Sequence, residues 1–566
     1  MDRGARFSRR SALGAIAAAP AVLHYADTAA AQQPGTPDER VPIDIAVVGA
    51  GVSGTYCCWR ILGARTGREP VLFEMSNRIG GRLLSVDLSP WGMPGVFGEL
   101  GGMRFLETQQ MVHNLVGHLR LPVSDFPVAG QNNFATLRNR MLKPADYKDP
   151  ALVPYRVLPS EERLNPGELL VKAITTVIPD ATRLRPQQWE ERKKTATWKD
   201  DNLYNWGLWN VLLSSDESGP VLSTEAYALL YDGGGYQSMV DNWNCAEAFE
   251  YLLLDFPSAA RYRRVTSGYQ RLPEQMADEF RKAGGKINME HELVSFDSIE
   301  IDGKPFVDID IRNNQTNVVH HYRADALVLA MPQRSLGRLL AKTPWLAKPE
   351  RRELLRSVMR MPAYKALAVY PEPWWQKRDV HAGRSTTDLP IRQVYYMDSA
   401  TPPNKTSLML ATYADGRAEN FWRPLLWDTE PLKAVPTASA TKAVAHVQVA
   451  PKDFKTTLKT LLAQMHQLRL PDIPEPVTSD AIMIRDWNTD PFGGGWHFWQ
   501  PKVKVWEVMP QVRQLVPGTP IYICGEAYAN QQGWVEGALT SAEHVLQDHF
   551  KLTWPAWLPK DYYIGP

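Results

Sequence analysis

The chain has 566 residues, of which 44% are hydrophobic, and its formal net charge at pH 7 is +1. A chain of this length can bury more than one hydrophobic core, and the usual size of a domain predicts two to four domains. The near-neutral charge gives no electrostatic reason to expect a nucleic-acid partner or an anionic membrane surface.

The first thirty-odd residues have the pattern of an export signal. Four arginines between residues 3 and 10 precede an apolar stretch at 12–23, which is shorter than the roughly 20 residues that span a bilayer. Ala29-Ala30-Ala31 then supplies a small-residue cleavage site. Residues 8–13 are similar to a twin-arginine signal, although Ala12 replaces the usual phenylalanine and no lysine follows. We predict a signal peptide at 1–31 and a periplasmic or secreted protein without a membrane anchor; the cleavage position is left open.

A glycine-rich turn follows the first predicted strand. The apolar run 43–48 is typical of a buried parallel strand, 49–54 reads Gly-Ala-Gly-Val-Ser-Gly, and 55–62 is predicted to be helical. In such a dinucleotide fingerprint Gly49 allows the tight turn, Gly51 lets the backbone approach a pyrophosphate, and Gly54 lets helix and strand pack closely. Val52 and Ser53 lie at the start of the helix. Glu74 ends a second strand, 70–74, where an acid accepts hydrogen bonds from the ribose hydroxyls.

The residues after Glu74 make the nucleotide more specific. The segment from Glu74 through Arg78-Ile79-Gly80-Gly81-Arg82 to Ser85 resembles the extended fingerprint of flavoproteins of the glutathione reductase and amine oxidase type. In those proteins paired glycines and arginines wrap the diphosphate and the flavin. The resemblance implies FAD as the cofactor.

Two further segments resemble the flavin amine oxidases and, within them, the L-amino acid oxidases. Residues 99–104, Glu-Leu-Gly-Gly-Met-Arg, look like the family's loop beneath the isoalloxazine ring, and 385–396 is similar to a segment of the snake-venom L-amino acid oxidases. Motif matches run from about residue 43 to residue 545. Residues 136–250 match nothing that can be placed.

The resemblance implies an α/β fold with a discontinuous Rossmann-like FAD-binding domain of the glutathione reductase/amine oxidase type, a mixed-sheet substrate-binding domain and a helical insertion. The predicted divisions are listed in chain order: the signal peptide at 1–31, the FAD-binding domain at 41–102 with 260–340 and 480–550, the substrate-binding domain at 103–135 with 341–479, the helical domain at 136–259 and a C-terminal tail at 551–566. Within them, strands are expected at 287–294, 324–331, 365–370, 408–412 and 521–524.

Four cysteines occur, and three of them, Cys57, Cys58 and Cys524, are expected to be small buried hydrophobic residues. Their spacing predicts neither a disulfide framework nor a metal site. The mitochondrial monoamine oxidases attach flavin to a cysteine near the chain end, and none follows Cys524 here. We therefore expect noncovalent FAD.

Oxidation of an amino acid at its α carbon transfers a hydride to flavin N5, so the site must hold the carboxylate, exclude water and accept a neutral amine. The resemblance assigns the carboxylate to Arg104, because a guanidinium donates two parallel hydrogen bonds to it. Successive side chains on a strand face opposite sides, so only one of Tyr395 and Tyr396 can face the flavin, and the resemblance selects Tyr396.

The remaining site residues also come from the resemblance. Gly533 places a backbone carbonyl near the substrate amine, Trp534 forms an aromatic wall, and Trp487 flanks the flavin ring. Lys365 is the catalytic candidate, because the family's lysine binds a water near flavin N5. The full set expected to bind the cofactor is Gly49, Gly51, Val52, Ser53, Gly54, Glu74, Arg78, Gly81, Arg82, Gly101, Gly102, Met103, Arg104, Val294, Trp487, Gly525, Glu526, Gly533, Trp534 and Val535.

These expectations describe an FAD-dependent L-amino acid oxidase that uses oxygen and releases 2-oxo acid, ammonia and hydrogen peroxide. The alternatives are an amino acid 2-monooxygenase with an amide product, an amine or polyamine oxidase without carboxylate recognition, and, most remote, a flavin-binding module without turnover. The side-chain preference stays open, because Asp232, Gln237, Asp241 and Cys245 cannot be placed from the sequence; an inward carboxylate would favour lysine or arginine. A homodimer is suggested by the family alone.

Overall fold

The protein is described here from a computed structural model that covers residues 40–566 with gaps at 217–218, 256–259, 428 and 432–446. The predicted signal peptide at 1–31 lies outside the described residues. Within the described part of the chain, every helix is too short or too polar to cross a membrane.

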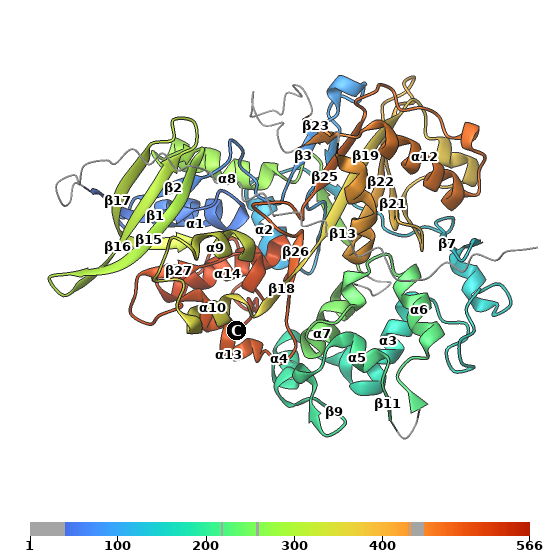
Figure 1. Cartoon of the computed structure of the whole chain (residues 1–566), viewed down its shortest axis with the longest axis horizontal. Helices are drawn as coiled ribbons and strands as arrows, with labels where there is room; N and C mark the ends of the chain where they lie inside the picture. Colours follow the sequence, from blue (N-terminus) through green and yellow to red (C-terminus); the bar gives the residue numbers. More distant parts are fainter. Residues whose placement is uncertain (1–39, 217–218, 256–259, 428, 432–446) are drawn as a thin grey trace, which may run out of the picture. The chain divides into compact units, whose positions relative to one another are not determined.

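A seven-stranded sheet is assembled from three distant parts of the chain, which are coloured blue, yellow-green and red in Figure 1. Strands β14, β2, β1, β17 and β27 pair in parallel, and β15, β16 and β17 pair antiparallel. The bounds are β1 (Val41–Val48), β2 (Pro70–Glu74), β14 (Lys286–Met289), β15 (His291–Ile301), β16 (Lys304–Asn313), β17 (Val319–Leu329) and β27 (Ile521–Ile523). The strands predicted at 43–48 and 70–74 are confirmed.

Helices cover both faces of this sheet. The side chains of β1 accordingly alternate between two hydrophobic cores, one on each face. Ile45 and Val47 pack in one core, and Ala46 and Val48 pack in the other. The first core includes helices α1 (Val52–Gly63), α2 (Gln110–His118), α8 (Arg271–Lys282) and α14 (Val535–Asp548); the second includes α9 (Gln333–Leu339), α10 (Pro349–Leu355) and α13 (Val505–Arg513). A sheet buried on both faces explains why β1 is apolar at consecutive positions.

Two predicted strands differ in extent from the structure. The stretch 287–294 is broken at Glu290, which has a φ of +60°, because β14 pairs in parallel with β2 whereas β15 turns away to pair antiparallel with β16. The strand expected at 324–331 begins earlier, at Val319, and ends at Leu329.

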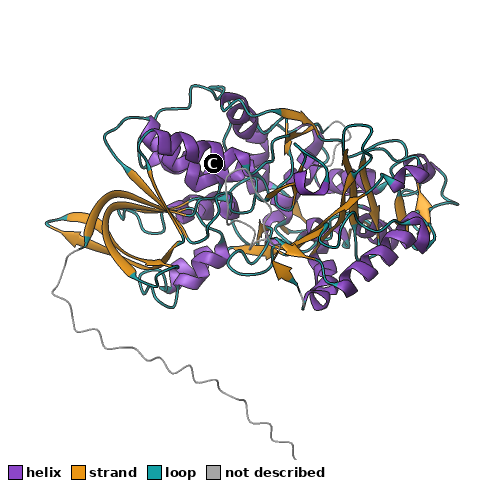
Figure 2. Cartoon of the chain, turned by 90° about the horizontal axis from the view of Figure 1, so that it is seen from above, coloured by secondary structure: helices purple, strands orange, loops and turns teal. Residues whose placement is uncertain are grey.

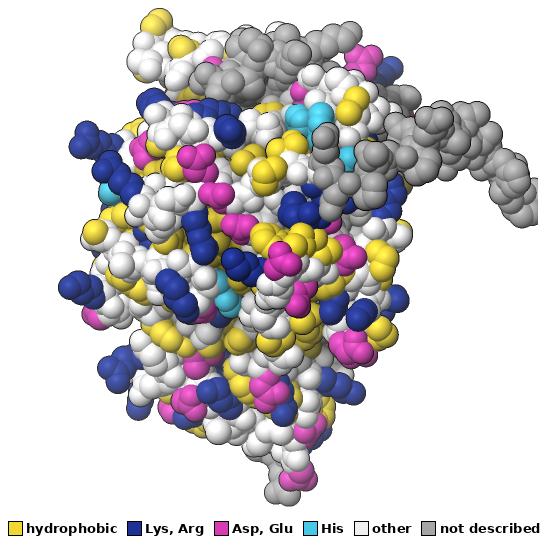
Figure 3. All heavy atoms as spheres, turned by 90° about the vertical axis from the view of Figure 1, so that its left-hand side faces the viewer, with side chains coloured by type: hydrophobic (Ala, Val, Ile, Leu, Met, Phe, Trp, Pro, Cys, Tyr) yellow, Lys and Arg dark blue, Asp and Glu magenta, His cyan; other side chains and the backbone are white. Residues whose placement is uncertain are grey.

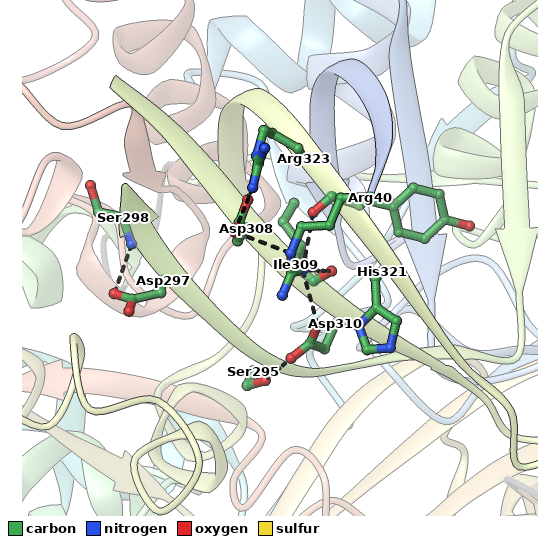
Figure 4. Close-up of polar contacts among 10 residues, drawn as sticks. Arg40, Ser295, Asp297, Ser298, Asp308, Ile309, Asp310, His321 and Arg323 are labelled. Atoms are coloured by element: carbon green, nitrogen blue, oxygen red, sulfur yellow. Dashed lines mark hydrogen bonds and ion pairs between the residues drawn. The ribbon is translucent and has the colours of Figure 1, made fainter. Parts of the chain in front are cut away.

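Strands β15, β16 and β17 carry a polar outer face. Val307, Ile309 and Ile311 point into the core, while Asp308 and Asp310 between them face outward. Arg40 lies 3.1 Å from each carboxylate, and Arg323 contacts Asp308 at 2.8 Å (Figure 4). Figure 2 shows these long strands curving together at one end of the described unit. On the face seen in Figure 3, acidic and basic side chains are interspersed rather than separated into patches of one sign.

A second, nine-stranded sheet is almost entirely antiparallel; only β20 and β7 pair in parallel. In spatial order its strands are β23 (Glu430–Pro431), β24 (Gln448–Val449), β25 (Ile482–Asp486), β19 (Ala363–Tyr370), β22 (Ser407–Asp415), β21 (Gln393–Ser399), β20 (Gly383–Thr387), β7 (Ala135–Leu137) and β8 (Arg140–Leu142). The strands predicted at 365–370 and 408–412 are confirmed by β19 and β22.

The two faces of this second sheet pack in different cores. Along β19, Tyr364 and Ala366 pack with helix α12 (Lys452–His466), while Leu367 and Val369 pack in the core of the helical segment. Helix α11 (Glu419–Trp422) also lies on the α12 side. Lys365 therefore lies on the side of the sheet that faces the helical segment.

The helical segment contains α3 (Pro166–Val177), α4 (Pro186–Thr195), α5 (Leu208–Leu212), α6 (Thr224–Gly233) and α7 (Cys245–Asp255). It also carries two short hairpins, β9 (Thr197–Trp198) with β10 (Asp201–Asn202) and β11 (Ser215–Asp216) with β12 (Gly219–Pro220). Helices are thus present at 166–255, inside the predicted helical range, but residues 135–142 belong to the nine-stranded sheet.

Three small sheets lie between these parts of the chain. They are β5 (Phe105–Leu106), β13 (Tyr262–Val265) and β6 (Val123–Asp125); β3 (Ser85–Asp87) with β4 (Phe97–Glu99); and β18 (Val358–Met361) with β26 (Trp496–Trp499). The segment 551–566, expected as a tail, packs into the core of α1 and α14: Leu552, Leu558 and Ile564 are buried, and the Tyr562 hydroxyl donates to Glu536 at 2.6 Å.

A buried ion pair joins α14 to α1 and provides a stability test. The fully buried Glu543 accepts hydrogen bonds from Arg60 at 2.9 Å and from the Tyr56 hydroxyl at 2.5 Å. We predict that Glu543→Gln lowers the free energy of unfolding by about 3 kcal/mol, because it leaves the largely buried Arg60 without its counter-charge. Thermal unfolding followed by circular dichroism measures this loss. Glu507→Gln, which breaks an exposed pair with Lys504, serves as the control and should change stability by less than about 0.5 kcal/mol; equal effects of the two substitutions would contradict the prediction.

Candidate active site

A cavity opens at the carboxyl ends of the parallel strands. Gly49 and Ala330, which directly follow β1 and β17, line it, together with Gly525, two residues after β27, and Glu74 at the end of β2. In open α/β sheets this edge is where ligands bind. The cavity continues toward the nine-stranded sheet and the helical segment, where Lys365, Tyr413 and Tyr251 line it.

Glycines make the close backbone approaches at the β1 end of this cavity. Gly49 has a φ of +106°, and a Cβ there would lie 2.4 Å from the Ala330 carbonyl oxygen. A Cβ on Gly54 would lie 1.9 Å from the Gly49 carbonyl oxygen, so Gly54 permits the helix to pack on the turn but does not itself line the cavity. Gly51 and Gly81 approach each other and both line the cavity, as do Val52 and Ser53 at the start of α1.

Two charged side chains brace this region. The Glu74 carboxylate accepts hydrogen bonds from the Ala50 N–H at 2.7 Å and from the Ser76 hydroxyl at 2.7 Å. Arg78 is buried and donates to the carbonyl oxygens of Gly81 at 2.5 Å and Leu83 at 2.6 Å. Burial lowers the pKa of Arg78 to about 10, so the guanidinium keeps its charge at neutral pH and fixes the loop that carries Gly81.

Glu526 joins three segments at the cavity wall. Its carboxylate accepts from the backbone N–H groups of His497 at 2.9 Å and Gly533 at 2.7 Å, and it lies 2.7 Å from Arg82. Burial alone would raise its pKa, but Arg82, His497 and the Gly533 N–H together lower it to about 2. The carboxylate therefore stays ionised and keeps Arg82 beside the cavity.

The loop at 100–103 is held by two side chains that the sequence singles out. Lys365 donates to the Gly101 carbonyl oxygen at 2.6 Å, and Trp487 donates to the Leu100 carbonyl oxygen at 2.7 Å. Burial lowers the pKa of Lys365 to about 7, an effect that Glu99 opposes and Arg104 adds to. Gly102, Met103 and Lys365 line the cavity, whereas Gly101 and Trp487 lie behind it. Trp487 is expected to flank the flavin ring; in the structure it does not line the cavity, whereas Phe492, which packs against it, does.

Arg104 lies in a cage of aromatic rings inside the cavity. Its guanidinium carbon is 4.5 Å from the centre of the Tyr262 ring, 5.7 Å from that of Phe126 and 5.8 Å from that of Tyr395. One nitrogen donates to the Tyr395 hydroxyl at 2.8 Å, but Nε has no hydrogen-bond partner among the described residues although it is buried. A buried guanidinium with an unused donor is suited to an anion that enters the cavity.

The tyrosine beside Arg104 is Tyr395, not Tyr396. The Tyr396 side chain lies on the opposite face of β21, in the core with α12, where its hydroxyl is 2.8 Å from His466 Nε2. Strand alternation correctly predicts that only one tyrosine faces the cavity side, but the predicted choice between them is wrong. The Tyr236 hydroxyl is 3.4 Å from that of Tyr395. Burial raises the pKa of Tyr395, yet the charges of Arg104 and Arg384 outweigh burial and lower it below its usual value.

Aromatic side chains form the wall around the C-terminal segment. The cavity lining includes three positions expected to bind the cofactor, Gly533, Trp534 and Val535. The rest of this wall consists of Tyr251, Trp496 and Tyr413. A Cβ on Gly533, whose φ is +80°, would lie 3.1 Å from the Tyr251 hydroxyl. The sequence patterns missed Tyr251, Tyr236 and Tyr262, which come from segments without recognisable motifs.

Several other residues considered from the sequence do not line the cavity. Val294 does not line the cavity; its neighbours His291, Glu292 and Leu293 do, because the backbone is irregular between Leu293 and Ser295. In the helical segment the four open candidates Asp232, Gln237, Asp241 and Cys245 all lie away from the cavity lining, and Met239 and Asp255 line it instead. Asp232, for example, accepts from Tyr155 at 2.8 Å.

The family model for flavin containing amine oxidoreductases matches residues 58–545. The chain belongs to this family. It is 26% identical to aplysianin-A of Aplysia kurodai, with 90% of each chain covered, and 24% identical to the L-amino acid oxidase Bs29 of Bothriechis schlegelii, again with 90% of each covered. Achacin of Lissachatina fulica is 25% identical, with 91% of this chain and 97% of the relative covered. The fold is similar to that of wild-type putrescine oxidase bound to putrescine, with a TM-score of 0.59, 14% identity, and 90% and 99% of the two chains covered.

Membership of this flavin amine oxidoreductase family implies a flavin, FAD, and the cavity fits such a group. Its glycines leave no Cβ at the backbone turns, and the start of α1, whose Gly51 N-cap provides no side-chain cap, points free N–H groups toward the space an anion would fill. Arg82 and Arg338 add positive charge to the lining, and Glu74 adds an acceptor. The donor set matches a dinucleotide with a diphosphate in its middle.

The Glu526 network predicts how firmly the protein retains flavin. We expect Glu526→Gln to lower the bound flavin per chain, because the loss of the charge releases Arg82 and weakens the hold on Gly533, at a cost of about 3 kcal/mol in a buried site. The ratio of flavin absorbance to protein absorbance after desalting measures the loss. Since the pKa of Glu526 is lowered to about 2, its contribution is present above its unfolded pKa near 4.3 and is lost only as the pH falls toward 2. Glu300→Gln, at an exposed position of β15, should retain the wild-type ratio; a full flavin complement in Glu526→Gln would refute the role of the carboxylate.

Proposed function

We propose that the protein catalyses the FAD-dependent oxidative deamination of L-amino acids, with oxygen as the electron acceptor. The observation that supports this proposal most directly is Arg104, a buried guanidinium in the cavity with an aromatic cage and with an Nε that has no hydrogen-bond partner among the described residues. A substrate carboxylate would satisfy this group. An amine or polyamine has no anion to offer, so the cage favours amino acids over amines.

The reaction consumes the amino acid, oxygen and water and produces 2-oxo acid, ammonia and hydrogen peroxide. When bound, the flavin supplies hydride acceptance at N5 and electron transfer to oxygen. A monooxygenase that leaves an amide product would use the same carboxylate anchor, and the products separate the two reactions.

The residues of the chain then have separate tasks. Arg104 and the Tyr395 hydroxyl orient the carboxylate, and thereby the α C–H bond. Tyr251, Trp534, Trp496 and Tyr413 exclude water. The Gly533 carbonyl accepts from the substrate amine, which reacts in its neutral form, so no general base is required. Lys365 holds a proton beside the cavity at Nζ.

The mode of flavin attachment, export and assembly are further parts of the proposal. Noncovalent attachment is supported by the cysteines, because all four are buried and none lines the cavity. Export to the periplasm or outside the cell rests on the sequence of residues 1–31. A homodimer rests on the family alone.

Replacement of the carboxylate anchor tests the proposal. We expect Arg104→Lys to lower kcat/KM for L-norleucine by about 10²- to 10⁴-fold, because the two parallel charge-assisted hydrogen bonds of a guanidinium are lost. Rapid-mixing absorbance under anaerobic conditions measures flavin reduction by L-norleucine and by 1-aminopentane, its decarboxylated counterpart. Arg469→Lys, at an exposed ion pair with Asp472, is the control and should behave as the wild type.

Two results would contradict the proposal. If 1-aminopentane reduces the wild-type flavin as well as L-norleucine does, Arg104 is not a substrate anchor and the protein is an amine oxidase. If amino acids reduce the flavin but an amide appears in place of peroxide and ammonia, the protein is a monooxygenase.

The low pKa of Lys365 predicts a pH dependence of the reaction with oxygen. A protonated Lys365 would stabilise negative charge that develops on oxygen, and the ammonium is present below its pKa of about 7 and lost above it. We therefore expect the rate of reoxidation by oxygen to fall as pH rises through about 7. In Lys365→Met the rate should be about 10²-fold lower and independent of pH in this range.

Stopped-flow mixing of the reduced protein with oxygenated buffer measures both rates. Lys452→Met, at an exposed position of α12, is the control. A pH profile that persists in Lys365→Met would assign the titration to another group, of which Glu99 is the nearest alternative, since burial raises its pKa to about 7.

A further inference from the structure

A carboxylate lies inside the same cavity as Arg104. Asp255, the last residue of α7, lines the cavity and is only 7% exposed. Its Oδ1 accepts a hydrogen bond from the Tyr262 hydroxyl at 2.7 Å, and no ion pair or hydrogen bond to Oδ2 occurs within the described part of the chain. A buried carboxylate without a direct ion-pair partner among the described residues is costly, and a cation that enters the cavity would offset this cost.

Tyr262 fixes Asp255 relative to the carboxylate anchor. Its hydroxyl donates to Asp255, and its ring lies 4.5 Å from the guanidinium carbon of Arg104. Asp255 and Arg104 attract each other through space, but no described ion pair joins them, so each group can still bind a ligand directly. The cavity therefore presents one positive and one negative group, both buried, on either side of a tyrosine.

A second, acidic cavity, the outer cavity, adjoins the cavity that contains Arg104, the inner cavity. Tyr251 and Trp534 line both cavities and so form the partition between them. The outer cavity is lined by four carboxylates and, among the described lining residues, by no basic side chain; the carboxylates are Glu190, Glu247, Glu250 and Asp561. Lys193 contacts the first three of these but neutralises at most one of their charges.

Helix α7 links the two cavities along one face. Glu247, Glu250, Tyr251 and Asp255 follow each other at spacings of three, one and four residues, so their side chains form a stripe on one side of the helix. Glu247 and Glu250 lie in the outer cavity, Tyr251 in the partition and Asp255 in the inner cavity. A molecule that passes from the outer to the inner cavity would meet carboxylates in both cavities.

We propose that Asp255 binds the side-chain cation of the substrate and makes the protein selective for L-amino acids with a positively charged side chain, such as lysine, ornithine and arginine. This inference rests on the function proposed above. Arg104 holds the α-carboxylate, Asp255 holds the distal cation, and the outer carboxylates attract cationic substrates toward the partition. Asp255 is then a specificity-determining residue rather than a catalytic one.

The test compares L-lysine with L-norleucine, which lacks only the terminal ammonium. In the wild type we expect kcat/KM for peroxide formation to be at least about 10-fold higher for lysine. In Asp255→Asn, which keeps an acceptor for the Tyr262 hydroxyl, the ratio of the two values should fall by about 10- to 100-fold. Asp297→Asn, on the exposed face of β15 (Figure 4), is the matched control and should retain the wild-type ratio.

A binding measurement tests the same inference without turnover. Hexanoate and 6-aminohexanoate are norleucine and lysine without the α-amine, and quenching of tryptophan fluorescence reports their dissociation constants because Trp496 and Trp534 line the cavity. We expect 6-aminohexanoate to bind at least about 10-fold more tightly to the wild type and to lose this advantage in Asp255→Asn. The comparison of the two dissociation constants for the wild type tests the selectivity even if the variant does not fold.

The outcomes separate the two proposals. If norleucine is oxidised as well as lysine and the two carboxylates bind equally, the selectivity is refuted while the oxidase assignment stands. If Asp255→Asn lowers kcat/KM for lysine and norleucine by the same factor, Asp255 serves as a counter-ion to Arg104 and the inference is overturned. If no amino acid reduces the flavin, both proposals fail.

Discussion

The cavity depends on one buried carboxylate, Glu526, which connects segments that are far apart in the chain. It accepts from the His497 and Gly533 N–H groups and pairs with Arg82, and so joins β26, the glycine loop after β2 and the C-terminal segment. Because its partners keep the pKa near 2, the carboxylate is charged under all ordinary conditions. Without it, Arg82 would lose its counter-charge and the turn at Gly533 would lose the acceptor for its N–H group.

Features that depend on local sequence could be predicted. The turn at Gly49 and the close packing at Gly54 follow from a strand, a turn and a helix that are consecutive in the chain, and the structure places both as expected. Parallel strands end at the same edge of a sheet, so Glu74 and Gly525 meet there although about 450 residues separate them.

Features that depend on how distant elements pack could not be predicted. Alternation shows that Tyr395 and Tyr396 face opposite sides, but which side meets the cavity is set by the pairing of β21 with β20 and β22. Trp487 and Phe492 are both aromatic residues in one turn, and only the contact of Trp487 with the Leu100 carbonyl places it behind Phe492. Asp255 lies at the end of a helix with no motif, so its position near Arg104 emerges only from the packing of α7 against β13.

The aromatic cage of Arg104 has a practical consequence. A guanidinium that is buried among three rings, and whose Nε has no partner in the part of the chain that the structure describes, is suited to bind small planar anions in general. Acetate, formate and benzoate share the carboxylate of an amino acid but have no α-amine to oxidise. If Arg104 holds the substrate carboxylate, as proposed, buffers that contain these ions would act as competitive inhibitors, and the apparent Michaelis constant of a substrate would depend on the buffer in which it is measured.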